Sequence, residues 1–144
     1  MDQIRLTELV GHWLKLTYRN LSNYLDSRLQ EYDLTSSQLG VLMLLWEQEG
    51  VTQKEIQTAV GVRSASLTFL IKGLDQKGLI VRKTDELDTR LNRVFLTEKS
   101  RALKEDCLQL VMETENKLAQ GVELGKIEEM VGILKQCNKN ILDE

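Results

Sequence analysis

The stretch TQKEIQTAVGVRSASLTFLIKGLDQKG, Thr52–Gly78, decides the fold predicted for this chain. Thr52 and Glu55 have the spacing of a capping box, which predicts a short helix that ends before Gly61. A second helix follows, with Ser64 as its N-cap and the final glycine of the stretch as its stop. Its core-facing side chains have the helical i, i+3, i+4, i+7 spacing and are Leu67, Leu70, Ile71 and Leu74. The stretch is therefore predicted to be helix, tight turn, helix over 52–77.

The next stretch, LIVRKTDELDTRLNRVFLT (Leu79–Thr97), is predicted to form a β-hairpin. Residues 78–83 and 92–97 are β-branched and apolar enough for two short strands. The charged finger between them has no place in a hydrophobic core. A helix-turn-helix followed at once by a β-hairpin is the winged-helix arrangement, so the finger is predicted to be a wing.

The rest of the chain is predicted to be helical, and it holds no proline that would interrupt a helix. A long amphipathic helix is expected from Ile4 to about Leu29. An almost wholly apolar helix begins at the capping box of Thr35 and Gln38 and ends near Gly50. After the hairpin, Thr97 caps another long helix, and a last helix follows the GVELG turn. The predicted fold class is mainly α with a small β-hairpin: a winged helix-turn-helix flanked by N- and C-terminal dimerisation helices.

Composition excludes several functional classes. A chain of 144 residues is expected to form a single domain, 1–144, and no apolar run approaches the roughly 20 residues that span a bilayer. No membrane partner is predicted, and without a signal-peptide pattern the expected location is cytoplasmic. Cys107 and Cys137 are expected to be inert buried thiols, and a single histidine makes a metal site improbable. No phosphate loop or nucleophile elbow is present, so neither an enzyme nor a cofactor is predicted.

Charge is distributed unevenly along the chain. The net charge is −3, yet the segment from Arg63 to Lys104 holds ten Lys/Arg and five Asp/Glu, a local charge of +5. The remaining residues carry −8. Partners respond to the local field more than to the total, so a basic middle segment favours double-stranded DNA as the partner.

Two sets of residues are predicted to contact DNA. Opposite the core stripe of the second helix, small polar side chains and one aromatic ring suit a helix that enters the major groove. An arginine near a loop tip suits the minor groove, where a nearby carboxylate can hold the guanidinium in position. The recognition-helix set is Ser64, Ala65, Ser66, Thr68, Phe69 and Lys72, and the wing set is Arg82, Lys83, Asp88, Arg90 and Arg93. The alternative is a winged-helix protein-interaction module without DNA binding, in which the hairpin is a docking surface.

LTSSQLGVLMLL, SASLTFLIKGLDQKGLIVR, DTR and VFLTEKSRAL together resemble successive signatures of the multiple-antibiotic-resistance regulator (MarR) family of winged-helix transcription factors. The resemblance implies a homodimer, with residues 1–33 and 98–144 as dimerisation helices and 34–97 as the DNA-binding region. It implies repression of nearby genes from a pseudo-palindromic operator, relieved by a small aromatic or anionic effector or by oxidation. Some relatives sense peroxide through a cysteine in the first helix, where this chain has none.

Two expectations concern the helical ends of the chain. The terminal helices carry more apolar surface than one small winged-helix core can cover, which independently favours a dimer. An effector crevice between the dimerisation and DNA-binding regions is predicted from His12, Trp13, Tyr18, Met43 and Trp46. The alternative is that these side chains are ordinary core residues.

Overall fold

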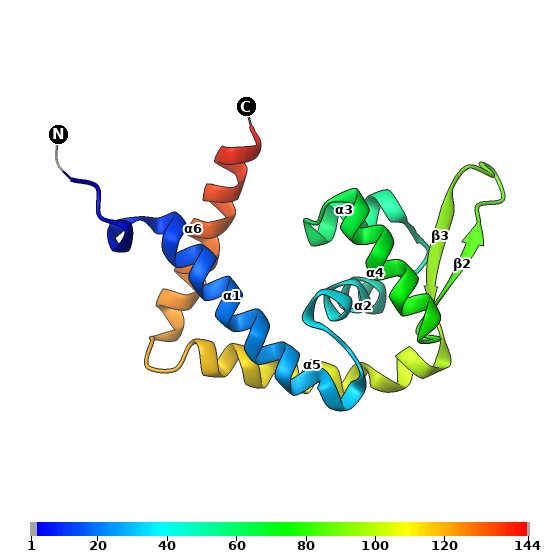
Figure 1. Ribbon diagram of the computed structural model, residues 1–144, viewed down its shortest axis with the longest axis horizontal. Helices are drawn as coiled ribbons and strands as arrows, with labels where there is room; N and C mark the ends of the chain where they lie inside the picture. Colours follow the sequence, from blue (N-terminus) through cyan, green and yellow to red (C-terminus); the bar gives the residue numbers. More distant parts are fainter. Residues whose placement is uncertain (1–2, 144) are drawn as a thin grey trace. The chain divides into compact units, whose positions relative to one another are not determined.

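The structure is a computed structural model that describes residues 3–143, and it divides into two compact units, Met1–Leu110 and Val111–Glu144. Figure 1 shows their helices and the hairpin. The helical elements of the first unit are η1 (Leu6–Glu8), α1 (Val10–Leu29), η2 (Gln30–Tyr32), α2 (Ser36–Glu47), α3 (Gln53–Val60), α4 (Ser64–Gln76) and the first part of α5 (Glu98–Leu118).

The helix predicted from Ile4 begins later, at Val10. Residues Leu6–Glu8 form a 3-10 turn, and Leu9 has an extended backbone, so the helical hydrogen-bond pattern is interrupted there. The indole of Trp13 donates to the Thr7 carbonyl at 2.9 Å and ties this turn to α1. Apolar periodicity alone did not locate the helix start, because it continues through the turn.

The predicted helix starts at α2 and α3 are confirmed, and both are capping boxes. Thr35 Oγ1 accepts from the backbone of Gln38 at 3.1 Å, and the Gln38 side chain accepts from the Thr35 backbone at 3.2 Å. Thr52 and Glu55 make the same reciprocal pair at 3.2 and 2.7 Å. Each box satisfies backbone N–H groups that the first helical turn leaves without a partner.

The hairpin belongs to a sheet with a third strand that was not predicted. Among the described residues the strands are β1 (Val51–Thr52), β2 (Ile80–Thr84) and β3 (Asn92–Leu96), in the order β1-β3-β2. Both pairings are antiparallel, with Val51 opposite Val94 and Ile80 opposite Leu96. The central strand β3 therefore connects the wing to the segment between α2 and α3.

α2 lies at the centre of the first unit, as its apolar sequence predicted, and contacts α1, α3, α4 and β3. On α4, Leu67, Ile71 and Leu74 are buried, whereas Leu70 is only half-buried, so the predicted core stripe is one residue too wide. The buried residues of α2 are Gln38, Leu39, Val41, Leu42 and Leu45.

The second unit contains the last turns of α5 and α6 (Leu124–Leu142), joined by a turn in which Gly121 has a φ of 82°. No residue of α6 is buried. Several large apolar side chains of this unit are exposed: Met112, Leu118, Val122, Leu124, Met130, Val131, Ile133, Ile141 and Leu142. Within residues 3–143, no helix is both long and apolar enough to cross a bilayer.

Candidate nucleic-acid interface

The side chains on the face of α4 opposite its core stripe are exposed to solvent. Its N-cap is Arg63, one residue before the predicted Ser64, which is the first helical residue and makes no cap. The side chain of Phe69 is 76% exposed although it belongs to a helix whose opposite face is core. The other predicted contact residues of this helix are also exposed: Ser64, Ala65, Ser66, Thr68 and Lys72.

The buried side chain of Gln38, on α2, links α2 to the C-terminal end of α4. Lys77, at the end of α4, donates to Gln38 Oε1 at 2.9 Å and to the Asp33 carbonyl at 2.5 Å. A Cβ atom at Gly73 would lie 2.9 Å from the Gln38 amide nitrogen, so glycine permits the close approach of the two helices. These contacts tie the C-terminal end of α4 to the start of α2.

The wing carries an arginine that its neighbouring carboxylate holds in place. Asp88 accepts from Arg90 Nε at 3.0 Å and from Nη2 at 3.1 Å, a two-point contact, and from the Arg90 backbone at 3.0 Å. The Arg90 side chain is nevertheless 88% exposed. The predicted contact, in which the carboxylate of the DTR motif holds the guanidinium, is confirmed. Arg90 therefore exposes its positive charge to solvent while Asp88 holds the guanidinium in position.

Arg93 has its hydrogen bonds inside the protein. Its Nε donates to Asp85 at 2.7 Å and its Nη1 donates to the Gly50 carbonyl at 2.8 Å, which joins the hairpin to the turn before β1. Arg93 is half-buried, in contrast to Arg90. The geometry gives it a structural role, and its predicted contact with DNA stays a prediction.

The two remaining cations of the wing lie at its base. Arg82 pairs with Asp75 of α4 at 3.2 Å, and the Lys83 ammonium lies 4.9 Å from the centre of the Phe95 ring. Both side chains are exposed, so they remain available to an anionic partner. A cation over an aromatic face is stabilised without a countercharge.

Hydrogen bonds from the arginines keep the wing carboxylates ionised. The Arg93 side chain holds the pKa of Asp85 below its usual value, and the Arg90 side chain does the same for the pKa of Asp88. At neutral pH both pairs are therefore fully charged. The shape of the wing does not depend on a proton that titrates in the physiological range.

Comparison with known proteins decides the family. The family model described as MarR matches residues 34–91. The organic hydroperoxide resistance transcriptional regulator of Bacillus subtilis (strain 168) is 31% identical over 109 residues, which cover 76% of this chain and 74% of that protein. The chain belongs to the MarR family. This family consists of transcriptional regulators and not of enzymes.

Two further proteins bear on the site. The HTH-type transcriptional regulator TtmR of Methylorubrum extorquens (strain PA1) is 43% identical over 84 residues, which are 57% of this chain but only 43% of that protein. The transcriptional repressor CouR, solved bound to a 23-mer DNA duplex, superposes with a TM-score of 0.84 at 26% identity, over 95% of this chain and 99% of that one. The winged helix-turn-helix fold predicted from the sequence is confirmed.

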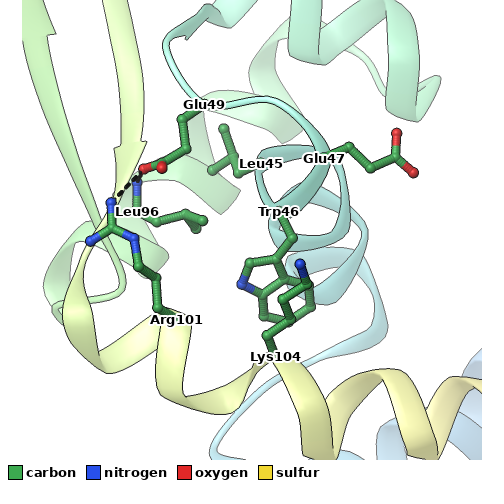
Figure 2. A pocket seen from close by; sticks show the side chains of 7 residues that line it. All are labelled: Leu45, Trp46, Glu47, Glu49, Leu96, Arg101 and Lys104. Carbon is green, nitrogen blue, oxygen red and sulfur yellow. Dashed lines mark hydrogen bonds and ion pairs between the residues drawn. The ribbon is translucent and has the colours of Figure 1, made fainter.

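Only Trp46 of the predicted effector residues of this MarR protein lines the pocket described here, and a crevice shared by all five stays a prediction. Trp46 lines a pocket of about 330 Å³, but His12, Trp13, Tyr18 and Met43 do not line it. The His12 ring packs edge-on against the Trp13 ring, with 5.4 Å between the ring centroids, and Tyr18 is exposed. Figure 2 shows the pocket, which is lined by Leu45, Trp46, Glu47, Glu49, Leu96, Arg101 and Lys104.

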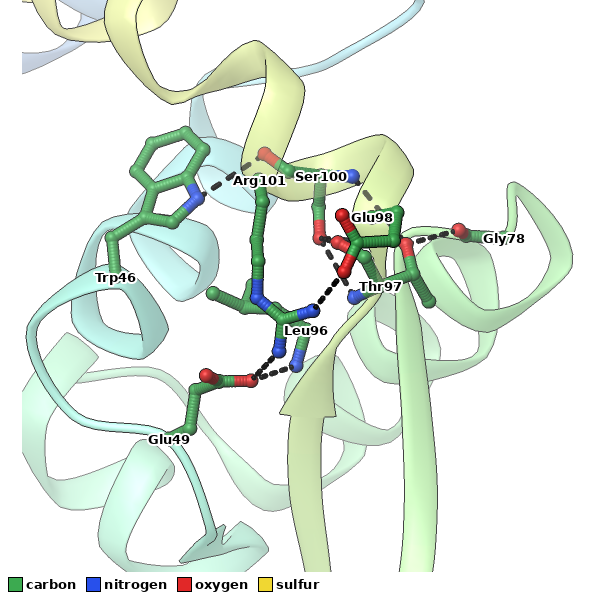
Figure 3. A network of polar contacts seen from close by, with 8 residues as sticks. All are labelled: Trp46, Glu49, Gly78, Leu96, Thr97, Glu98, Ser100 and Arg101. Carbon is green, nitrogen blue, oxygen red and sulfur yellow. Dashed lines mark hydrogen bonds and ion pairs between the residues drawn. The ribbon is translucent and has the colours of Figure 1, made fainter.

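Glu49 is the centre of a polar network that sequence reasoning missed (Figure 3). Its Oε1 accepts from the Leu96 backbone and from Arg101 Nη2, both at 2.8 Å. These donors hold the pKa of Glu49 below its usual value. Since Leu96 ends β3 and Arg101 lies in the first turn of α5, one carboxylate joins both elements to the turn between α2 and β1. No local motif signals it, because its partners are more than forty residues away.

The same region fixes the start of α5. Thr97, predicted as its cap, accepts from the Ser100 backbone at 3.4 Å, and the Thr97 hydroxyl donates to the Gly78 carbonyl at 2.7 Å. The Trp46 indole donates to the Ser100 carbonyl at 3.2 Å (Figure 3). The wing strand and α5 are therefore attached to α2 at the same place.

The two cysteines differ in burial. Cys107 is buried, and burial raises the pKa of its thiol to about 11. Cys137 is half-buried, so the prediction of a fully buried thiol was wrong there. Among residues 3–143, no group of three or more His, Cys, Asp and Glu side chains has the arrangement of a metal site.

Proposed function

We propose that two copies of this chain form a homodimer that binds a pseudo-palindromic DNA operator and represses transcription. The observation that carries the proposal is the pairing of an exposed, polar outer face on α4 with a wing that presents Arg90 to solvent. A helix with short side chains fits the major groove, and an arginine beside it fits the minor groove. The repressor CouR, with a similar fold, was solved on a DNA duplex.

The dimer is supported by apolar side chains at both ends of the chain that the single chain leaves exposed. In the first unit these are Ile4, Leu6, Leu9, Val10, Trp13, Leu14 and Tyr18. The apolar residues of the second unit, given above, add to them. Residues 1–33 and 98–144 are proposed to form a two-fold interface of more than ~2,000 Å². A two-fold dimer reads half-sites about ten base pairs, or a multiple of that, apart.

Release by a small aromatic or anionic effector is the regulatory part of the proposal. The Trp46 pocket offers an indole surface and the cation Lys104, which suit such a molecule. Because an operator lies on the chromosome, the proposal also places the protein in the cytoplasm.

The experiment is a selection of duplexes from genomic fragments, followed by mobility-shift titrations at two salt concentrations. Specific DNA binding that displaces counterions weakens steeply as salt rises. Arg90→Ala should weaken binding without lowering thermal stability, because the side chain is almost fully exposed. Failure of the purified protein to enrich any duplex would support the alternative, a winged-helix protein-interaction module.

A further inference from the structure

The tip of the wing exposes a leucine. Leu87 is 98% exposed, more than any other large apolar side chain among residues 3–143. It stands in a loop of mostly charged and polar residues. A leucine in that position gives nothing to the fold of the single chain, because burial is what makes an apolar side chain stabilising.

The backbone that carries Leu87 is closely tied. The Asp85 carboxylate accepts from the backbone N–H of Leu87 at 3.1 Å and from that of Asp88 at 2.9 Å. The loop is closed by Leu91, whose N–H donates to the Asp88 carbonyl at 3.0 Å and whose carbonyl accepts from the Asp85 N–H at 2.9 Å. Asp85 is itself held by Arg93. A tip organised in this way loses little conformational freedom when it binds.

Leu87 is carried on the same loop as the fixed cation. Arg90 is three residues further on and is held by Asp88. The narrow minor groove of A·T-rich DNA has the most negative potential and attracts arginine. Glu86, the exposed acid beside Leu87, is repelled by phosphates and opposes DNA binding. The attraction between the tip and DNA therefore comes only from Arg90 and from apolar contact.

We propose that Leu87 enters the minor groove beside Arg90 and selects A·T over G·C pairs there, an inference that rests on the proposed DNA binding. The floor of the minor groove at A·T pairs carries acceptors only, whereas each G·C pair adds the guanine N2 amino group. An apolar side chain gives that amino group no acceptor and occupies the space of its water, so G·C is penalised. In other DNA-binding folds, apolar side chains enter the minor groove as wedges between base steps.

The first experiment measures affinity for a duplex that the wild-type protein has selected from a random-sequence library. Leu87→Ala removes three carbons and is expected to weaken binding about fivefold per wing. Leu87→Met keeps the apolar volume and should restore most of the affinity. The matched control is Val81→Ala, which shortens an exposed apolar side chain at the base of the same hairpin and should change affinity less than about twofold.

The second experiment changes the DNA. A·T pairs under the wing are replaced by G·C and then by inosine·cytosine, which keeps the major-groove groups of G·C but lacks the N2 amino group. Wild-type affinity should fall about tenfold on G·C and recover on inosine·cytosine. For Leu87→Ala the G·C penalty should shrink, leaving the part due to Arg90.

The outcomes separate the two proposals. If the wild-type protein selects no duplex, DNA binding itself is wrong. If it selects one, but Leu87→Ala binds as tightly and discriminates against G·C as strongly as wild type, only the role of Leu87 is overturned. The same holds if inosine·cytosine fails to restore affinity, because the penalty then arises outside the minor groove.

Discussion

Replacing Asp88 by alanine is expected to have two opposite effects on DNA binding. Asp88 is an acid in a surface proposed to face phosphates, so its removal makes the wing more positive. It also holds the guanidinium of Arg90 through two hydrogen bonds of 3.0 and 3.1 Å and accepts from the Arg90 backbone. If positioning dominates, Asp88→Ala weakens specific binding even though the net charge becomes more favourable.

The magnitudes follow from the geometry of the pair. A freed arginine must lose its rotamer freedom on binding, which costs up to about tenfold in affinity per wing. The gain from removing one acid is smaller, because salt screens charges on an exposed loop, and is expected to reach at most about threefold. Binding to a random-sequence duplex has no fixed geometry, so there only the gain should appear.

The assay compares the affinity for a selected operator with the affinity for a random duplex, at the same salt concentration. Glu86→Ala is the matched control, because it changes the net charge equally and Glu86 makes no contact with Arg90 that the structure describes. It should strengthen both affinities. For Asp88→Ala the ratio of specific to non-specific affinity should fall. A ratio that stays constant, with both affinities increased as in Glu86→Ala, would refute the positioning role.

Three other predictions concern α4, the thiols and the network around Glu49. Phe69→Glu should abolish operator binding while sedimentation shows an unchanged oligomer; unaltered affinity would remove Phe69 from the interface. Cys107 should resist a thiol reagent at pH 8 until the protein is unfolded, because its pKa is raised to about 11; rapid labelling of a Cys137→Ser variant would contradict this. Glu49→Ala leaves the partly buried N–H of Leu96 without its acceptor and should lower stability by about 1 kcal/mol in urea titrations. Glu98→Ala, which removes an exposed partner of the same arginine, should cost far less; equal losses would refute the central role of Glu49.

Local signals made the helix-turn-helix predictable. The capping boxes at Thr35 and Thr52 involve residues only three positions apart, so their chemistry is visible in the sequence. The signals that end the two helices are local too, since Gly61 and Gly78 both adopt a φ of 70°, which glycine tolerates best. The same logic failed for Ser64, because a good N-cap residue next to a helix can equally be its first residue.

Long-range features were not predictable from pattern. The strand Val51–Thr52 has only two residues and exists because β3 lies beside it. The roles of Glu49 and Arg93 depend on partners more than forty residues away along the chain. Leu87 was overlooked for a different reason. A single leucine among charged residues has no periodicity, and only the fold shows that it is almost fully exposed.

Trp46 is an intrinsic fluorescent probe, because its indole donates a hydrogen bond to the Ser100 carbonyl at the start of α5. The chain has only one other tryptophan, Trp13, which lies on the exposed surface of α1. In a Trp13→Phe variant, all indole emission would therefore come from the point where α2 meets the start of α5. Fluorescence could then follow, without an attached dye, how that joint responds when the wing or the adjoining pocket is occupied.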